Sequence, residues 1–336
     1  KGMADMERMM NEFEQYKGRL SEGPEIVAKV YKLADDLDVL SYLVYRYPGL
    51  KFALNSRDDE ASANFQRVQT LFARFSTAMA WMEPELLSIG WETMSKWLDE
   101  YEGLAPYRHP ITDAYRQQAH VLSEDKERLL SYYSLLNGNP SATHAALSTA
   151  DIKFPEITLS DGSTSTLTAG NYRSILTNNG NQEDRRAAFE NYYKTFSDNA
   201  NTYASTYNGV LQADWANAQA RNYATCLEAG LDGYNVPPSV VENLIAAVKR
   251  GLGPLHRYEK IRQKALGLET YHYYDGSYPI VNFFKTYEYD DIVEWIIASV
   301  EPLGKEYQDQ VRKAFESRWV DVYETPNKRG GAFSGD

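Results

Sequence analysis

The sequence is short of the residue types that most often carry catalysis or cross-link a fold. It has a single cysteine, Cys226, so no disulfide bond can form within the chain. It has only five histidines, and none of them stands in an H-E-x-x-H pattern, in which two histidines one helical turn apart bind zinc. The residue chemistry alone therefore shows no complete active site.

Positive charge and long apolar runs are also scarce. The chain has 35 lysines and arginines against 47 acidic residues, which gives a formal net charge of -12 at pH 7. Proteins that bind nucleic acids usually present a basic stripe, and anionic membranes attract basic clusters, so neither partner is expected. No apolar run reaches the length of a transmembrane helix. The composition is that of a soluble globular protein.

Three local patterns could carry chemistry, and each has a simpler explanation. Cys226 matches no thiol-enzyme signature, which favours a buried cysteine without a catalytic role. Glu269 and His272 have the E-x-x-H spacing of di-metal sites, but such a site needs the motif on two helices. His256 and Glu259 would share a helix face, as surface pairs commonly do. We therefore expect no catalytic residue and no metal ligand in this chain.

Apolar residues recur at helical spacing through most of the chain. The stripe from Ile26 to Val44 predicts a long helix that ends at Pro48-Gly49, and a later helix is expected to end at residues 137–140. Similar stripes follow at 65–82, 91–98, 189–215, 241–248, 292–303 and 311–319. The 26 tyrosines would suit either the walls of a wet cleft or contacts between helices. The pattern predicts a mainly α fold of long amphipathic helices.

Two segments depart from the helical period. Residues 157–168 place β-branched side chains on both sides of Asp161-Gly162, which predicts a small β-hairpin. Residues 320–334 combine the apolar-polar alternation of Val320 to Tyr323 with a turn at Pro326-Asn327 and a pair of glycines. This second pattern predicts a C-terminal hairpin whose last strand lies at an edge.

The glycine pair opens the candidate substrate-binding segment: Gly330, Gly331, Ala332, Phe333 and Ser334. Glycine has no side chain to keep another backbone away, so this strand could pair with an extended peptide. Backbone hydrogen bonds would then supply affinity without sequence specificity. The alternative is a glycine-rich tail with no role, and the residues alone leave both interpretations open.

Several segments resemble the oligoendopeptidase F family of zinc peptidases, and they occur in the family's order. The matching segments are Met82 to Leu87, Leu104 to Arg108, Ala150 to Pro155, the hairpin with Leu167-Thr168, Asp184 to Phe189, Tyr192-Tyr193, Leu255 to Tyr258, Tyr274-Asp275, Pro302 to Tyr307, Arg318 to Tyr323 and Lys328 to Ser334. Each segment is short, and their common order over most of the chain is what makes the resemblance specific.

The resemblance implies a largely helical, cytoplasmic zinc endopeptidase that cuts short peptides in an enclosed groove. It implies an N-terminal helical domain at 1–149 and the first part of the catalytic domain at 150–336, with Gly330 to Ser334 paired to substrate. In the family, the zinc histidines, the catalytic glutamate and the third zinc ligand follow the segment that matches Ser334. We therefore expect this chain to lack the zinc-binding half and to be inactive by itself.

Two other interpretations remain open. The chain could be a non-catalytic helical protein that binds peptides, or half of an enzyme completed by another chain. If the catalytic half is missing, apolar and tyrosine-rich helix faces would be exposed, and we expect association through them. A reading frame that continues beyond Asp336 into H-E-x-x-H would favour the peptidase over both alternatives.

Overall fold

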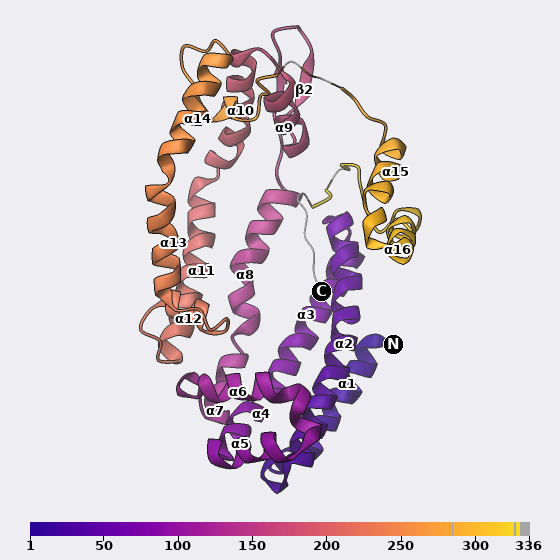
Figure 1. Ribbon diagram of the computed structural model, residues 1–336, viewed down its shortest axis with the longest axis vertical. Helices are drawn as coiled ribbons and strands as arrows, with labels where there is room; N and C mark the ends of the chain where they lie inside the picture. The colour runs from indigo at the N-terminus through magenta and orange to yellow at the C-terminus, as the bar shows by residue number, and fades with distance from the viewer. Residues whose placement is uncertain (282, 284, 326, 330–336) are drawn as a thin grey trace. The chain divides into compact units, whose positions relative to one another are not determined.

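The structure is a computed structural model, and it describes residues 1–281, 283, 285–325 and 327–329 (Figure 1). Most of these residues are helical, and the sheet among them has two antiparallel strands. The predicted mainly α fold with a small hairpin is confirmed. No helix in the described ranges is both long and apolar enough to cross a membrane.

The chain folds into two compact units. The first comprises residues 1–152, 199–251 and 327–329, and the second comprises the described residues of 153–198 and 252–325. The division into a helical domain at 1–149 and part of a catalytic domain at 150–336 concerns family domains and stays a prediction.

The first unit is all helical. Its helices are α1 (Gly2–Phe13), α2 (Pro24–Leu54), α3 (Asp59–Met79), α4 (Met82–Ser88), α5 (Trp91–Glu100), α6 (Arg108–Arg116), α7 (Glu124–Ser131), α8 (Ser134–Ala145), α11 (Ala200–Ala220), α12 (Cys226–Asp232) and α13 (Pro238–Arg250). Short 3₁₀ turns lie at Glu14–Tyr16, Leu20–Glu22, Glu102–Tyr107 and Gln118–His120, and a π-helical turn, η5, at Ala146–Ala150.

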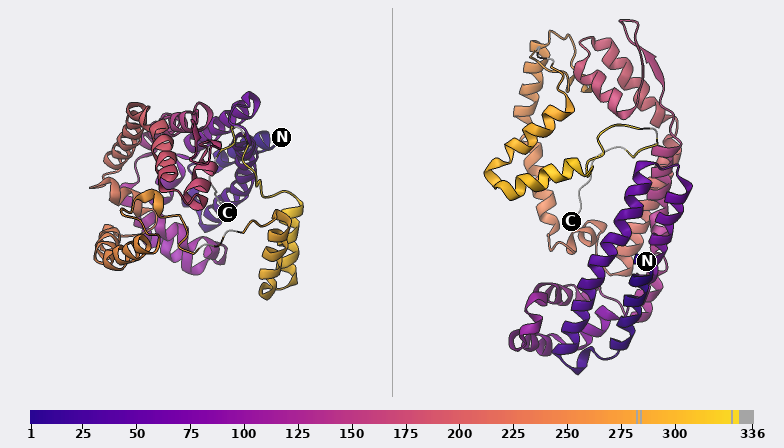
Figure 2. Two further views of the ribbon diagram at one scale, coloured as in Figure 1. Left: turned by 90° about the horizontal axis from the view of Figure 1, so that it is seen from above. Right: turned by 90° about the vertical axis from the view of Figure 1, so that its right-hand side faces the viewer.

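The core of the first unit lies between α1, α2, α3 and the shorter helices α4 to α6. Helices α2 and α3 lie side by side (Figures 1 and 2), and α1 packs against both. The buried side chains include Met6, Phe13, Leu20, Val27, Val30, Leu37, Leu86, Met94, Leu104 and Ile111. Burying this apolar surface is the main force that holds the helices together.

Two helices continue through prolines that were predicted to end them. Helix α2 passes Pro48 and ends at Leu54, and α8 passes Pro140 and ends at Ala145. The prediction was wrong because packing outweighs the local cost of proline. A β-carbon added to Gly49 would lie 3.3 Å from the ring of Phe65, and that ring stacks on Phe52 with centroids 5.6 Å apart. These contacts hold the last turn of α2 against α3.

The second unit contains the predicted hairpin. Strands β1 (Glu156–Thr158) and β2 (Thr164–Thr166) pair antiparallel, with Ile157 opposite Ser165. Gly162 in the turn has a φ of 82°, and Asp161 accepts a hydrogen bond from the amide of Ser163 at 2.8 Å. The Asp-Gly signal therefore led to the correct turn.

The remaining elements of the second unit are helical. They are α9 (Ala169–Asn178), α10 (Gln182–Ser197), α14 (Leu252–Ala265), α15 (Tyr289–Ser299) and α16 (Lys305–Glu316), with 3₁₀ turns at Tyr273–Asp275 and Glu301–Leu303. Tyr172 of α9 stacks on Tyr192 of α10, with ring centroids 4.3 Å apart. At this contact, the tyrosines serve helix packing.

Only the first part of the hairpin predicted at 320–334 lies among the described residues. Residues 320–325 and 327–329 contain no strand, and Gly330 to Ser334 lie outside the described residues. A strand needs a neighbour that accepts its backbone hydrogen bonds. The backbones of Asn327 and Arg329 instead bond to the end of α2.

Candidate functional site

The predicted substrate-binding residues, Gly330, Gly331, Ala332, Phe333 and Ser334, lie outside the described residues, but the backbone that leads to them is described. The amide of Arg329 donates a hydrogen bond to the carbonyl of Ala53 at 2.9 Å. The carbonyl of Asn327 accepts from the amide of Ser56 at 3.0 Å and from its hydroxyl at 2.9 Å. Three hydrogen bonds therefore anchor the chain directly before Gly330.

The end of α2 can accept this segment because of where the helix stops. The last four carbonyls of an α-helix have no partner within the helix, and Ala53 supplies one of them. If α2 had ended at Pro48, that carbonyl would not stand at a helix terminus. Sequence patterns miss Ala53 and Ser56 because their contribution is mostly backbone.

The turn after α2 also binds the π-helical turn η5. The guanidinium of Arg57 donates two hydrogen bonds to the carbonyl of Ala150, the one from Nε at 2.9 Å. Asp58 then caps α3 by accepting from the amide of Ala61 at 2.9 Å. Turns with i to i+5 hydrogen bonds are frequent at functional sites. The turn at 55–58 therefore holds together the end of α2, the start of α3, η5 and residues 327–329.

The histidines and the cysteine do not form a metal site. Among the described residues, no group of three or more His, Cys, Asp or Glu side chains could hold a metal ion. His272 bonds to the hydroxyl of Thr270 at 2.9 Å. Cys226 was expected to be buried, but it is exposed. It opens α12, a surface helix with no buried side chain, which is why the expectation failed.

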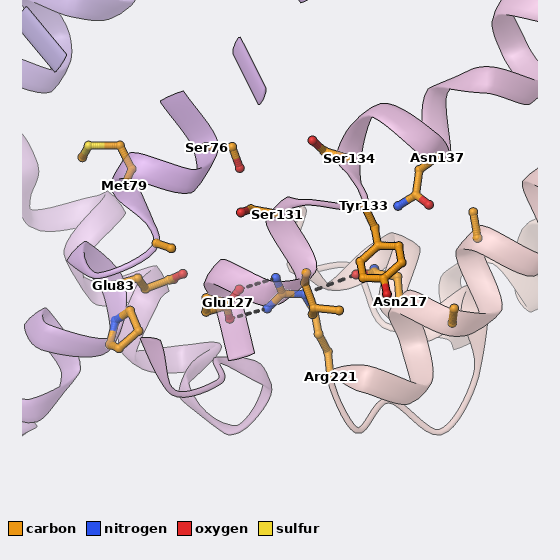
Figure 3. A pocket seen from close by; sticks show the side chains of 15 residues that line it. Ser76, Met79, Glu83, Glu127, Ser131, Tyr133, Ser134, Asn137, Asn217 and Arg221 are labelled. Carbon is orange, nitrogen blue, oxygen red and sulfur yellow. Dashed lines mark hydrogen bonds and ion pairs between the residues drawn. The ribbon is translucent and has the colours of Figure 1, made fainter. Parts of the chain in front are cut away.

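A pocket of about 430 Å³ in the first unit gathers charged residues from distant parts of the sequence (Figure 3). Helices α3, α4, α7, α8 and α11 contribute to its wall. The lining residues are Ser76, Met79, Ala80, Glu83, Pro84, Glu127, Leu130, Ser131, Tyr133, Ser134, Asn137, Ala213, Ala216, Asn217 and Arg221.

Glu127 and Arg221 form a bidentate ion pair in this pocket. Both oxygens of Glu127 accept from the guanidinium of Arg221 at 2.8 Å, and Oε1 also accepts from the amide of Leu122 at 2.9 Å. Burial of the Glu127 carboxyl acts to raise its pKa, but these hydrogen bonds outweigh burial and lower it. Such bidentate pairs are geometrically specific and stronger than neutral hydrogen bonds.

Glu83 faces the same pair from the start of α4 (Figure 3). The side chain of Glu83 is exposed to solvent, although nearby protein atoms partly desolvate its carboxyl. Burial raises the pKa of Glu83, the charge of Glu127 raises it further, and the charge of Arg221 lowers it. Carboxyl groups with shifted pKa values are typical of functional sites, and structural networks of ion pairs also shift pKa values.

Two family models together match most of the chain. Residues 85–154 match the family model described as Oligopeptidase F. Residues 175–336 match the model of peptidase family M3. The two matches follow each other along the sequence and cover both the helical first part and the segment that contains the glycine pair.

Individual relatives agree with the family models. Oligopeptidase PepF of Bacillus subtilis is 32% identical over 325 residues, which cover 95% of this chain and 48% of that protein. An oligoendopeptidase F homologue of Lactococcus lactis is 32% identical over 310 residues, covering 92% of this chain and 51% of that protein. The chain therefore spans about half the length of the curated relatives it matches.

A solved structure shows the same fold. The crystal structure of oligoendopeptidase F from Enterococcus faecium is similar to this chain with a TM-score of 0.79 and 28% identity, covering 94% of this chain and 60% of that one. The family models, the relatives and this structure all support the resemblance carried by the sequence segments. The chain belongs to the oligoendopeptidase F family, within peptidase family M3.

Proposed function

We propose that this chain is part of a zinc-dependent oligoendopeptidase that hydrolyses short peptides in an enclosed groove. It supplies a wall of the groove and, through Gly330 to Ser334, an edge strand that pairs with the substrate backbone. The names of the relatives as oligopeptidases and oligoendopeptidases support peptide hydrolysis. The cytoplasm is the proposed compartment, on the family resemblance.

The observation that carries the proposal is the backbone anchor directly before the glycine pair. The bonds of Asn327 and Arg329 to the end of α2 tie down the chain on one side of Gly330. A strand that receives a peptide gains from such anchoring, because less conformational freedom is lost when the peptide binds. The glycines that follow would let the peptide backbone come close.

Zinc belongs to this proposal through the family resemblance. The residues that the structure describes do not fit a zinc site, and the sequence contains no H-E-x-x-H. We therefore assign no step of the reaction to these residues. The proposal is that the chain by itself does not hydrolyse peptides.

The test is to substitute the glycines in the protein made from the whole reading frame that contains this chain. Gly331→Val places a branched side chain where the peptide backbone is proposed to lie. It should lower kcat/KM for a quenched fluorescent peptide by roughly tenfold to a hundredfold, since small misplacements near a scissile bond are costly. Bound zinc, measured on the same sample, should not change.

Gly335→Val is the matched control, because it makes the same substitution just beyond the proposed strand. It should retain kcat/KM within about twofold, as substitutions outside a binding contact usually do. If Gly331→Val also retains full kcat/KM, the segment is a glycine-rich tail and the strand-pairing proposal is wrong.

A further inference from the structure

The anchor before Gly330 fixes two successive peptide groups. The carbonyl of Asn327 accepts from both the amide and the hydroxyl of Ser56, at 3.0 and 2.9 Å. The amide of Arg329 donates to the carbonyl of Ala53 at 2.9 Å. Because a peptide group is planar, the first contact orients the group between residues 327 and 328, and the second orients the group between 328 and 329. The backbone that approaches Gly330 is therefore held in both position and orientation.

Ser56 supplies two of these three hydrogen bonds. A carbonyl oxygen can accept two hydrogen bonds, and the amide and hydroxyl of Ser56 both bond to that of Asn327. Asn327 has a φ of 65°, in the left-handed region that few residues other than glycine adopt. Such a conformation persists where surrounding contacts hold it. Alanine at position 56 would keep the amide donor but lose the hydroxyl.

The turn that carries Ser56 is itself held on several sides. Oδ1 of Asn55 accepts from the amide of Arg57 at 3.1 Å, and the carbonyl of Asn55 accepts from the amide of Asp58 at 3.2 Å. Nε of Arg57 donates to the carbonyl of Ala150 in η5 at 2.9 Å, and Asp58 caps α3. Ser56 therefore lies on a turn that is tied to α3 and η5 and can fix the position of the segment that bonds to it.

Pairing between two extended backbones needs a defined register. Side chains alternate between the two faces of a strand, so a slip by one residue moves every side chain of the peptide to the opposite face. A strand that begins at a fixed point presents its donors and acceptors at fixed places. We propose that Ser56 is a positioning residue that sets the register in which a substrate peptide pairs with Gly330 to Ser334. The inference rests on the proposed function, since it requires that this segment bind the peptide.

The test is Ser56→Ala in the protein made from the whole reading frame, with a short peptide of mixed sequence as substrate. Loss of one hydrogen bond should lower kcat/KM about threefold to tenfold. The loosened strand should also pair with the peptide in neighbouring registers, so mass spectrometry of the products should show new cuts at bonds next to the parent cleavage site. A loss of stability alone would lower the rate and leave the cleavage site unchanged.

Two further variants serve as controls. Ser56→Thr retains the hydroxyl and should keep the rate and the cleavage site of the parent protein. Ser88→Ala makes the same substitution at the end of α4, where the hydroxyl donates to the carbonyl of Glu85 at 2.6 Å. It should leave the rate and the cleavage site unchanged. Circular dichroism and bound zinc, measured on each variant, verify that the protein is folded and loaded.

The outcomes separate failure of this inference from failure of the proposed function. If Ser56→Ala keeps the rate and products of the parent while Gly331→Val lowers kcat/KM, Ser56 does not position the strand and the inference is wrong. A lower rate with unchanged products, or an equal loss in Ser88→Ala, also overturns it. If Gly331→Val itself retains the rate of the parent, the proposed function fails and the inference fails with it.

Discussion

Arg185 and Asp275, which are 90 residues apart, form an ion pair that is almost completely shielded from solvent. Nη2 of Arg185 lies 2.6 Å from Oδ1 of Asp275, and the exposed fractions of the two side chains are 1% and 0%. Gln182 and the amide of His272 donate to the other oxygen at 2.8 and 2.9 Å. Helix α10 and the turn at 273–275 are thereby joined by a fully hydrogen-bonded charge pair.

Removing one partner of this pair should destabilise the second unit strongly. Arg185→Met leaves the carboxylate of Asp275 buried without its cation, which should cost about 3–5 kcal/mol of the free energy of unfolding. Arg186→Met is the matched control, because Arg186 is half-exposed and its ion pairs among the described residues are surface pairs with Glu183 and Glu190. Its cost should stay below about 1 kcal/mol. Urea unfolding of both variants measures the difference, and equal costs would contradict the buried pair.

Two glycines inside helices should respond to alanine with opposite signs. A β-carbon on Gly209 of α11 would lie 2.8 Å from Cγ of Pro140, a rigid ring on α8. Gly209→Ala should therefore destabilise the chain, by about 1–3 kcal/mol. Gly138 of α8 has nothing within 4 Å, so Gly138→Ala should stabilise by about 0.5–1 kcal/mol through helix propensity. Thermal unfolding gives both signs, and two shifts of the same sign would refute the close approach of α8 and α11.

The carboxyl of Glu83 should make stability depend on pH. Its pKa is raised from an ordinary value of 4.5, so the folded state holds the proton more tightly than the unfolded state. The stability it contributes is full below the ordinary value and is lost as pH rises through the raised one. Glu83→Gln cannot ionise and should be more stable than the parent chain at neutral pH, by less than about 1 kcal/mol because the pocket is open to solvent.

The measurement is the melting temperature of the parent chain and Glu83→Gln across the acidic to neutral range. The advantage of the variant should grow as pH rises above about 4.5 and vanish below it. An advantage that shrinks as pH rises would contradict the raised pKa.

The fold could be predicted where local chemistry decides it. The hairpin turn at Asp161-Gly162 could be predicted from the residues alone. The continuation of α2 through Pro48 and of α8 through Pro140 could not be predicted from local sequence. Those helices are held by contacts with Phe65 and Gly209, which lie far away in the sequence.

The site was less predictable than the fold. The anchor before Gly330 uses backbone atoms of Ala53, Ser56 and Asn327, and backbone hydrogen bonding leaves no residue-type signal. Glu127 and Arg221 are 94 residues apart, so no local spacing joins them. The order of the family segments was the signal that led to the peptidase family, and it came from the whole chain rather than from any one motif.

The most direct test of the central proposal compares this chain with the protein made from its whole reading frame. Both samples are characterised by intact mass, bound zinc and hydrolysis of a quenched fluorescent peptide. We expect a mass near 38.3 kDa, no bound zinc and no hydrolysis for the chain alone, and stoichiometric zinc with chelator-sensitive hydrolysis for the whole protein. Chelator-sensitive hydrolysis by the chain alone, or a whole protein that binds peptides without zinc and without cutting them, would contradict the account.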